Sequence, residues 1–266
     1  MTWVEIARYL EKGDTVLIPV GATEQHGAHM ALFTDTGWAV GLAEGAAVAA
    51  DSLIAPPVHY GWGPHHMAYA GTITLRSSTL TQLCVDIGES LAFHGFRKLI
   101  FINGNRMANL PAMQLAASRL RNSTGAFAAV VDTGLMAKKA VHAICTSAYG
   151  GLGHAGESET SYMLHLWPHL VDMSKAKTVT RSQPEFSPSV TTFEPPYDLD
   201  SVYVPPVLDE FLESTSPHEG LAGDALAASK EKGAQIHDVL CTALVEYIDK
   251  VVRPKKVSLK SISVPN

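Results

Sequence analysis

The chain has 266 residues, of which 46% are hydrophobic and 17% charged, so a sizeable core is possible and disorder is not expected. A net charge of −6 argues against a protein that grips nucleic-acid phosphates, which needs a concentrated basic face. No stretch approaches the roughly 20 apolar residues of a membrane span, residues 1–16 lack the apolar region of a signal peptide, and the three cysteines form no CxxC pair. We expect free thiols and a cytoplasmic protein that binds neither nucleic acid nor membrane.

Short apolar segments alternate with helical patterns along the chain. The segment TVLIPV at 15–20 is a typical buried strand, because it is short, apolar and rich in β-branched residues. The alternation predicts an α/β fold in which a mostly parallel sheet is sandwiched by helices, within a single domain over 1–266. The predicted helices are 3–11, 35–50, 79–95, 109–121, 158–167 and 222–251, and the further predicted strands are 52–58, 98–102 and 126–131.

Residues 178–206 differ from the rest of the chain. They are rich in Pro, Ser and Thr but also hold four aromatic residues. A loop of this length in a compact domain is usually functional or disordered, and its aromatic content favours an ordered arm or lid.

The first candidate site is the acid–imidazole pair Glu24 and His26, which directly follows the buried strand, with Asp35 nine residues after His26. Carboxylate and imidazole are ligands for zinc- and manganese-class ions. Residues i and i+2 of an extended segment share a face, so the pair could point to one side and Asp35 could return to join it. The alternative interpretation is a surface turn in which Asp35 caps the following helix.

Two further clusters combine histidine with glycine-rich segments. His154 precedes a predicted helix whose first turn holds Glu159; this acid could bind an ion or only complement the helix dipole, and His154 could act as acid or base. His65 and His66 follow Trp62 in a Gly/Pro-rich loop, which could form a substrate wall or a solvated loop.

Several motifs in the expected order resemble the creatininase family. The segment PVGATEQHGAHMALFTD resembles the family's Glu-Gln-His-Gly signature and its following Asp, and GHAGESETS resembles its His-Ala-Gly helix start. YGWGPHHMAYAGTITL, INGNRMANL and AASKEKG resemble further family segments, so the likeness covers about residues 3–250.

The resemblance implies a metal-dependent hydrolase with one or two divalent ions, Mn or Zn, and a homo-oligomer, often a hexamer. It implies Glu24, His26 and a bridging Asp35 as ligands, with Glu159 as a further candidate. It implies His154 and His66 as catalytic residues; His65, Trp62 and Arg106 are the candidate substrate contacts.

The chain departs from the family at one ligand. The family's Asn-Gly-His motif supplies a histidine where this chain has Asn105, and Met107 stands where creatininase has an acid. An amide oxygen is a poor zinc ligand but suits harder ions. Two hypotheses follow: a single ion held by His26, Asp35 and Glu159, or a second, harder ion kept by Asn105.

The same change makes creatinine an unfavourable substrate. We expect a small, polar, cyclic carbonyl compound, with hydrolytic C–C ring opening of an oxidised inositol (3-dehydro-scyllo-inosose type, in carbohydrate metabolism) as the favoured reaction. The alternatives are C–N hydrolysis of a cyclic amide or formamide, and a binding protein that has lost catalysis.

Overall fold

The computed structural model describes residues 1–147, 151, 153–179 and 207–261. Residues 180–206, which make up most of the predicted arm or lid, lie outside the described residues. Within the described part of the chain, no helix is long and apolar enough to cross a membrane. All three cysteines of the sequence are free thiols, as predicted.

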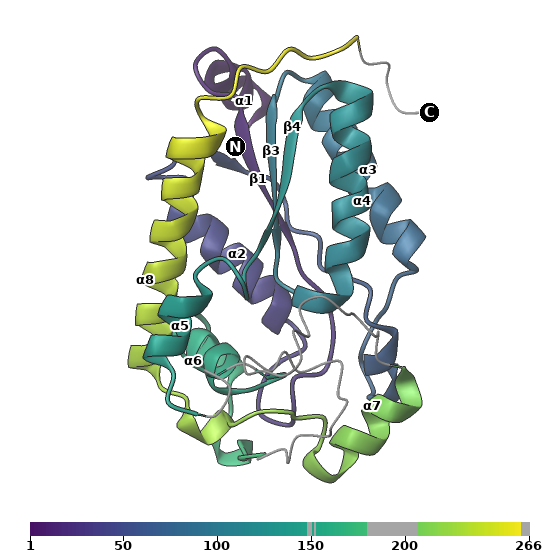
Figure 1. The fold of residues 1–266 in the computed structure, drawn as a ribbon, viewed down its shortest axis with the longest axis vertical. Coiled ribbons are helices and arrows are strands. Elements are labelled where there is room, and N and C mark those ends of the chain that lie inside the picture. The colour runs from purple at the N-terminus through teal and green to yellow at the C-terminus, as the bar shows by residue number, and fades with distance from the viewer. Residues whose placement is uncertain (148–150, 152, 180–206, 262–266) are drawn as a thin grey trace, which may run out of the picture.

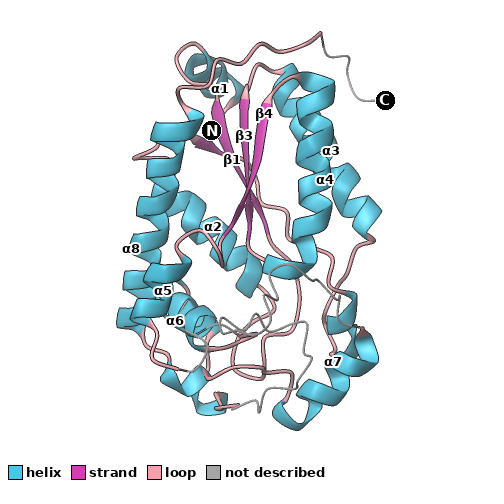
Figure 2. Ribbon diagram, viewed as in Figure 1, coloured by secondary structure: helices cyan, strands magenta, loops and turns pink. Residues whose placement is uncertain are grey.

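A parallel sheet forms the centre of the molecule (Figure 2). Its four strands have the order β2-β1-β3-β4, and every neighbouring pair is parallel, which confirms the predicted α/β architecture. The strands are β1 (Thr15–Val20), β2 (Leu53–Ile54), β3 (Lys98–Asn103) and β4 (Phe127–Asp132).

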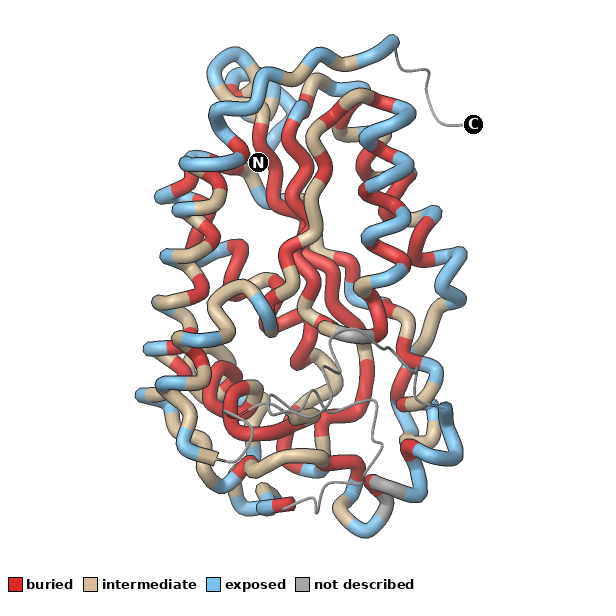
Figure 3. Tube along the Cα trace, viewed as in Figure 1, coloured by how far each residue is buried: buried red, intermediate tan, exposed pale blue. Residues whose placement is uncertain are grey.

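Helices cover both faces of this sheet (Figure 1). Side chains alternate along each strand, so Leu17 of β1 enters one hydrophobic cluster while Val16 and Ile18 enter the other. Figure 3 shows the buried strands between helices whose outer sides are exposed. The first cluster packs against α2 (Thr34–Ala47), α6 (Glu157–Leu166) and α8 (Lys230–Tyr247), and the second against α1 (Trp3–Leu10), α3 (Ser77–Phe93) and α4 (Arg106–Thr124).

Several predicted boundaries were wrong. Only two residues of the expected 52–58 strand pair regularly, because Pro56 and Pro57 follow and proline has no N–H to donate. The closing helix starts at Lys230 rather than 222, where the Ser229 hydroxyl caps it by accepting from the Lys232 N–H. The helix after β3 starts at Arg106, three residues early, and two short helices were not predicted: α5 (Lys138–Ile144) and α7 (Leu208–Thr215).

The carboxyl ends of β1 and β3 bring the candidate ligands together. The Gly104 N–H donates to the Val20 carbonyl, which joins the two strand ends. A Cβ atom at Gly104 would lie 1.9 Å from the main-chain oxygen of Asp35, so only glycine lets this turn contact the first turn of α2. Asp35 and Asn105 therefore lie beside the segment that carries Glu24.

Candidate metal centre

Four predicted ligands from three separate segments converge at one point. His26 Nε2 lies 3.4 Å from Asp35 Oδ1 and 3.7 Å from Glu159 Oε2. Glu24, His26 and Asp35 form a compact group of potential ligand atoms, and so do His26, His154 and Glu159. Glu24, His26 and Asp35 are buried, while 28% of the Glu159 side chain is exposed. The structure thus favours the interpretation of Asp35 as a site residue over that of a surface helix cap.

The Nε2 atom of His26 faces the carboxylates of Asp35 and Glu159 but forms no hydrogen bond with any residue that the structure describes. His26 Nδ1 lies 3.2 Å from the Glu24 main-chain oxygen, which accepts the Nδ1 proton, so Nε2 is the ring nitrogen that can bind a cation. Among the described residues, Nε2 is a buried atom with no hydrogen-bond partner. Two ligands about 2.1 Å from a tetrahedral zinc ion lie about 3.4 Å apart, which matches the His26–Asp35 separation. These residues therefore fit a divalent cation.

The electrostatics of the cluster call for a positive charge. Burial, and next the Asp35 carboxylate, raise the pKa of Glu24 well above its ordinary value. Burial also raises the pKa of Glu159 to about 7, against the effect of His26. Burial alone would lower the pKa of His26, but the three surrounding carboxylates raise it to about 10. A protonated imidazole thus serves as the cation of the metal-free cluster.

Asn105 lies between two of the acids. Its Nδ2 atom donates hydrogen bonds to Glu24 Oε2, at 2.7 Å, and to Asp35 Oδ2, at 3.2 Å. In this arrangement the amide offers hydrogen atoms, and not a ligand oxygen, to the position between the two carboxylates. The side chain of Met107 is not among those described.

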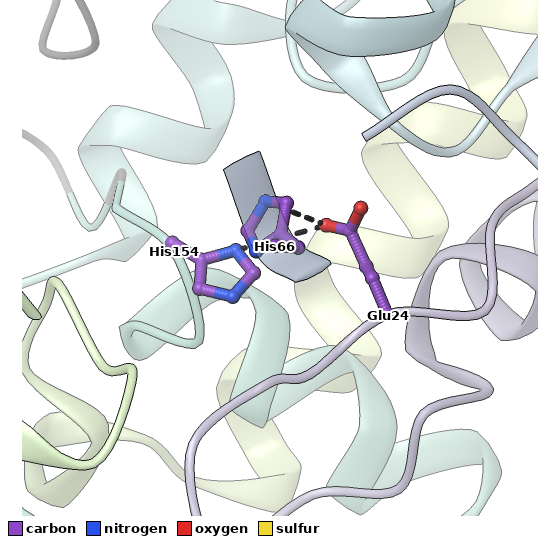
Figure 4. A group of neighbouring side chains, drawn as sticks. All are labelled: Glu24, His66 and His154. Atoms are coloured by element: carbon purple, nitrogen blue, oxygen red, sulfur yellow. Dashed lines mark ion pairs between the residues drawn. The ribbon is translucent and has the colours of Figure 1, made fainter. Parts of the chain in front are cut away.

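The two candidate catalytic histidines lie beside Glu24 (Figure 4). His66 Nε2 is 3.2 Å from Glu24 Oε1, and His154 Nδ1 is 4.0 Å from the same oxygen. The ring centroids of His66 and His154 are 4.5 Å apart. Burial, followed by the charges of neighbouring histidines, lowers the pKa of His66 well below its ordinary value, so this ring is neutral at neutral pH. Both predicted catalytic residues therefore border the metal cluster.

The remaining predicted contacts lie at different distances from the cluster. The His65 ring contacts the His66 ring at an interplanar angle of 45°, with centroids 4.1 Å apart, and burial lowers the pKa of His65 to about 4. Trp62 packs against the hydrophobic cluster on the α3–α4 face of the sheet. The Arg106 side chain lies near Gly134, at the end of β4, where burial raises the pKa of Asp132 to about 6 and the charge of Arg106 opposes that rise. The structure therefore places His65 beside the catalytic candidates, Trp62 in the hydrophobic cluster, and Arg106 near the end of β4.

Two residues at the site were not predicted. The Gln25 side chain contacts both catalytic candidates, with Nε2 at 3.2 Å from His66 Nδ1 and 2.9 Å from His154 Nε2. Phe211, from α7, packs edge-on against the His66 ring at a centroid distance of 4.5 Å. Gln25 had a visible signal, since it lies inside the Glu-Gln-His segment, whereas Phe211 had none because its helix was not predicted.

The neighbouring acid Glu157 has a different environment. Its carboxylate is fully buried and accepts hydrogen bonds from the Lys232 ammonium and from the main-chain N–H groups of Thr146, at 2.9 Å, and Ser147, at 2.7 Å. Although burial opposes it, the Lys232 contact and these bonds lower the pKa of Glu157 to about 2. This acid joins α6 to α8 and is satisfied by the chain itself.

Comparison with known families points to one group of enzymes. A family model described as creatininase, creatinine amidohydrolase, matches residues 1–248. Creatinine amidohydrolase of Pseudomonas putida is 32% identical over 271 residues, covering 96% of each chain. Mycofactocin precursor peptide peptidase of Mycobacterium ulcerans is 38% identical over 59% of this chain and 60% of its own. 3-dehydro-scyllo-inosose hydrolase of Thermotoga maritima is 27% identical over 95% of this chain and 81% of its own.

Solved structures agree with these matches. A crystal structure of creatinine amidohydrolase superposes with a TM-score of 0.74 and 28% identity, over 96% of this chain and 97% of the other. Two more creatininase structures, one described with Mn and one as a Zn–Zn type, each give a TM-score of 0.71 at 28% identity, with the same coverage. The metals expected for the cluster are therefore those described for structures with this fold.

Proposed function

The chain belongs to the creatininase family of metal-dependent hydrolases, and from that premise we propose that it is an amidohydrolase that opens the C–N bond of a small, polar, cyclic amide with one divalent ion per chain. One observation carries this proposal. His26 Nε2 is buried without a hydrogen bond and faces the carboxylate oxygens of Asp35 and Glu159.

The hydrogen bonds of Asn105 support a single ion. Its amide group donates to both Glu24 and Asp35, so the position between these carboxylates already has its positive partners. A cation placed there would compete with the amide hydrogens and would lack the family's imidazole ligand. The oxygens that face His26 are Asp35 Oδ1 and Glu159 Oε2, whereas Asn105 donates to the other oxygen of Asp35. The set of His26, Asp35 and Glu159 therefore remains able to hold one ion.

The chemistry divides between the ion and the surrounding side chains. His26, Asp35 and Glu159 would hold the divalent ion, which would supply Lewis-acid polarisation of the substrate carbonyl. His154 accepts a proton from the attacking water and returns it to the leaving nitrogen as the C–N bond breaks. Glu24 lies within reach of His154 and stabilises its protonated form. The net change is addition of one water across the amide.

The surroundings of the site favour a small substrate. Phe211 packs on the rings of His65 and His66, with centroids at 5.0 and 4.5 Å, and His66 is itself buried. This aromatic layer packs on His66, which contacts Glu24, and burial of the site strengthens the electrostatic contacts within the cluster. Solvent reaches the site at the partly exposed side chains of Glu159 and His154.

C–C ring opening of an oxidised inositol is the second candidate. The inosose hydrolase of Thermotoga maritima matches 95% of this chain, although at 27% identity it is a more distant relative than the creatinine amidohydrolase. The single-ion arrangement favours this reaction too, because polarising one ketone needs one ion and one acid–base group.

A homo-oligomer, hexameric as in the sequence-based expectation, and a cytoplasmic location remain proposals. Size-exclusion chromatography with light scattering would test the first, and cell fractionation would test the second.

Product analysis separates these candidates. Purified protein is supplied with one equivalent of Zn or Mn and offered creatinine, other five- and six-membered cyclic amides, and an oxidised inositol. We expect metal-dependent opening of a cyclic amide, with a new amine and carboxylate in equal amounts, and no opening by His26→Ala. If only the oxidised inositol were turned over, C–C ring opening would replace C–N hydrolysis as the proposed function. Absence of both bound metal and turnover would favour a binding protein.

A further inference from the structure

We propose that Gln25 is a positioning residue that assigns different tasks to the two histidines: its side chain commits His66 to donating a proton to Glu24, and its main-chain oxygen keeps the proton of His154 on Nε2. The hydrogen-bond assignment stands on the contacts of Gln25 alone. The use of His154 as the base rests on the proposed function.

The orientation of the Gln25 amide is determined by two main-chain groups. The Gly27 N–H donates to Gln25 Oε1 at 2.9 Å, which identifies that atom as the oxygen. Gln25 Nε2 lies 3.1 Å from the Gly220 carbonyl, which can only accept. The side chain is buried, so these bonds do not compete with bulk water.

Counting hydrogens then assigns both rings. Gln25 Nε2 has two hydrogen atoms but three neighbours: the Gly220 oxygen, His66 Nδ1 at 3.2 Å and His154 Nε2 at 2.9 Å. His154 Nε2 also lies 2.6 Å from the Gln25 main-chain oxygen, and this short contact requires a proton on Nε2. A protonated Nε2 cannot accept from the amide. The two amide hydrogens therefore go to Gly220 and to His66 Nδ1.

The two rings consequently present opposite faces to Glu24. His66 accepts at Nδ1, so as a neutral ring it has its proton on Nε2, which donates to Glu24 Oε1 at 3.2 Å. His154 has its proton on Nε2, so its Nδ1 lone pair points toward the same oxygen at 4.0 Å. Glu24, His66 and His154 have the spacing of a metal-binding group, but a protonated Nε2 on His66 makes them a donor and a base around one carboxylate.

A glycine from a distant part of the chain makes this arrangement possible. Gly220 has a φ of +85°, and a Cβ atom at this position would lie 2.2 Å from Gln25 Oε1. A side chain here would be strained by the backbone and would displace the amide. The loop that contains Gly220 is thus shaped to accept Gln25, 195 positions earlier in the sequence.

Nitrogen NMR of the zinc-loaded protein, labelled with ¹⁵N at histidine and glutamine, tests the assignment. We expect a proton on Nε2 and none on Nδ1 of both rings, and a coupling across the hydrogen bond from Gln25 Nε2 to His66 Nδ1 and not to His154. His66→Gln and His154→Gln variants assign the signals. A coupling to His154 Nε2, or an unprotonated Nε2 on either ring, would overturn the proposal.

The Gln25→Glu variant adds a test that a merely structural role would not pass. A carboxylate at this position accepts rather than donates, so His66 Nδ1 becomes protonated. His154 keeps its pattern, because its partner is the main-chain oxygen of residue 25. We expect kcat to fall about 10- to 100-fold with little change in KM. A change at both rings, or at neither, contradicts the proposal. If the tautomers hold but no amide is opened, the proposed function fails and the positioning role stands.

Discussion

Two glutamates in the first turn of α6 show how differently one helix can treat a carboxylate. Glu157 is surrounded by donors, namely the Lys232 ammonium and the N–H groups of Thr146 and Ser147, and its pKa falls to about 2 although burial opposes this. The helix dipole favours both acids, since both lie in the first turn. The difference between them must come from the partners that the fold brings to each.

Glu159 has few such partners. It accepts one hydrogen bond from the Ala155 N–H, at 2.7 Å, and otherwise faces His26 and the Asp35 carboxylate. Its pKa rises to about 7, mainly through burial. The chain thus supplies the counter-charge for one acid and leaves the other to share a protonated imidazole. The cluster around Glu159 therefore fits a divalent cation in place of the proton on His26.

The largest expected effect comes from removing the charge of Glu159. In Glu159→Gln, the ion loses a charged ligand, and we expect both the affinity for Zn and kcat/KM to fall at least about 100-fold. The free energy of unfolding of the metal-free protein should not fall, because burial raises the pKa of Glu159 and so disfavours its charged form in the folded state. Isothermal titration with Zn and urea denaturation measure the two quantities. Wild-type metal affinity in this variant would remove Glu159 from the site.

The matched variant Glu157→Gln should reverse this pattern. It leaves the Lys232 ammonium without its carboxylate, and we expect the free energy of unfolding to fall by about 2–4 kcal/mol, because removing one partner of a buried ion pair exposes the cost of burying the other. Bound metal per chain should stay the same. A variant as stable as the wild type would show that Glu157 is not an anchor between α6 and α8.

The free energy of unfolding below pH 4.5 should depend on the ionisation of Glu157. Its pKa is depressed from an ordinary value of 4.5 to about 2, so the folded state holds the carboxylate ionised where the unfolded chain binds a proton. This contribution is complete above pH 4.5 and is lost as the pH falls toward 2, and it amounts to roughly 2–3 kcal/mol. Urea denaturation at pH 6, 4 and 3 should show the difference between wild type and Glu157→Gln shrinking with falling pH. A constant difference would contradict the assignment.

A smaller loss of stability than that of Glu157→Gln is expected for Asn105→His. The substitution removes amide hydrogen bonds to Glu24 and Asp35, and we expect the metal-free protein to lose about 1–2 kcal/mol. It also provides an imidazole beside two carboxylates, so the variant should bind a second ion. Metal analysis after dialysis checks this, with Asn105→Gln as a control that keeps an amide and should bind one ion.

The sequence predicted the parts of the fold that depend on local pattern. β1, β3 and β4 lie within one residue of their expected bounds, because each is a short, mostly apolar run with β-branched or aromatic residues. The expected 52–58 strand failed at Pro56 and Pro57, and the start of α8 was misplaced because the Ser229 cap is a single side-chain contact inside a helical pattern.

The site was predictable only in part for a related reason. Glu24, His26 and Asp35 share a short segment after one strand, so their convergence follows from the direction of a parallel sheet. The role of Gln25 depends on Gly220, 195 positions away, and no local pattern reveals that contact. The different environments of Glu157 and Glu159 likewise depend on Lys232 in α8, so the two acids looked equivalent in the sequence.

The metal content of the purified protein is the most direct test of this account. After equilibration with Zn or Mn and removal of free ions, native mass spectrometry should find one ion per chain in the wild type and none in His26→Ala. Two ions per chain in the wild type, or one ion retained without His26, would show that the cation is not held where His26 Nε2 faces Asp35 and Glu159.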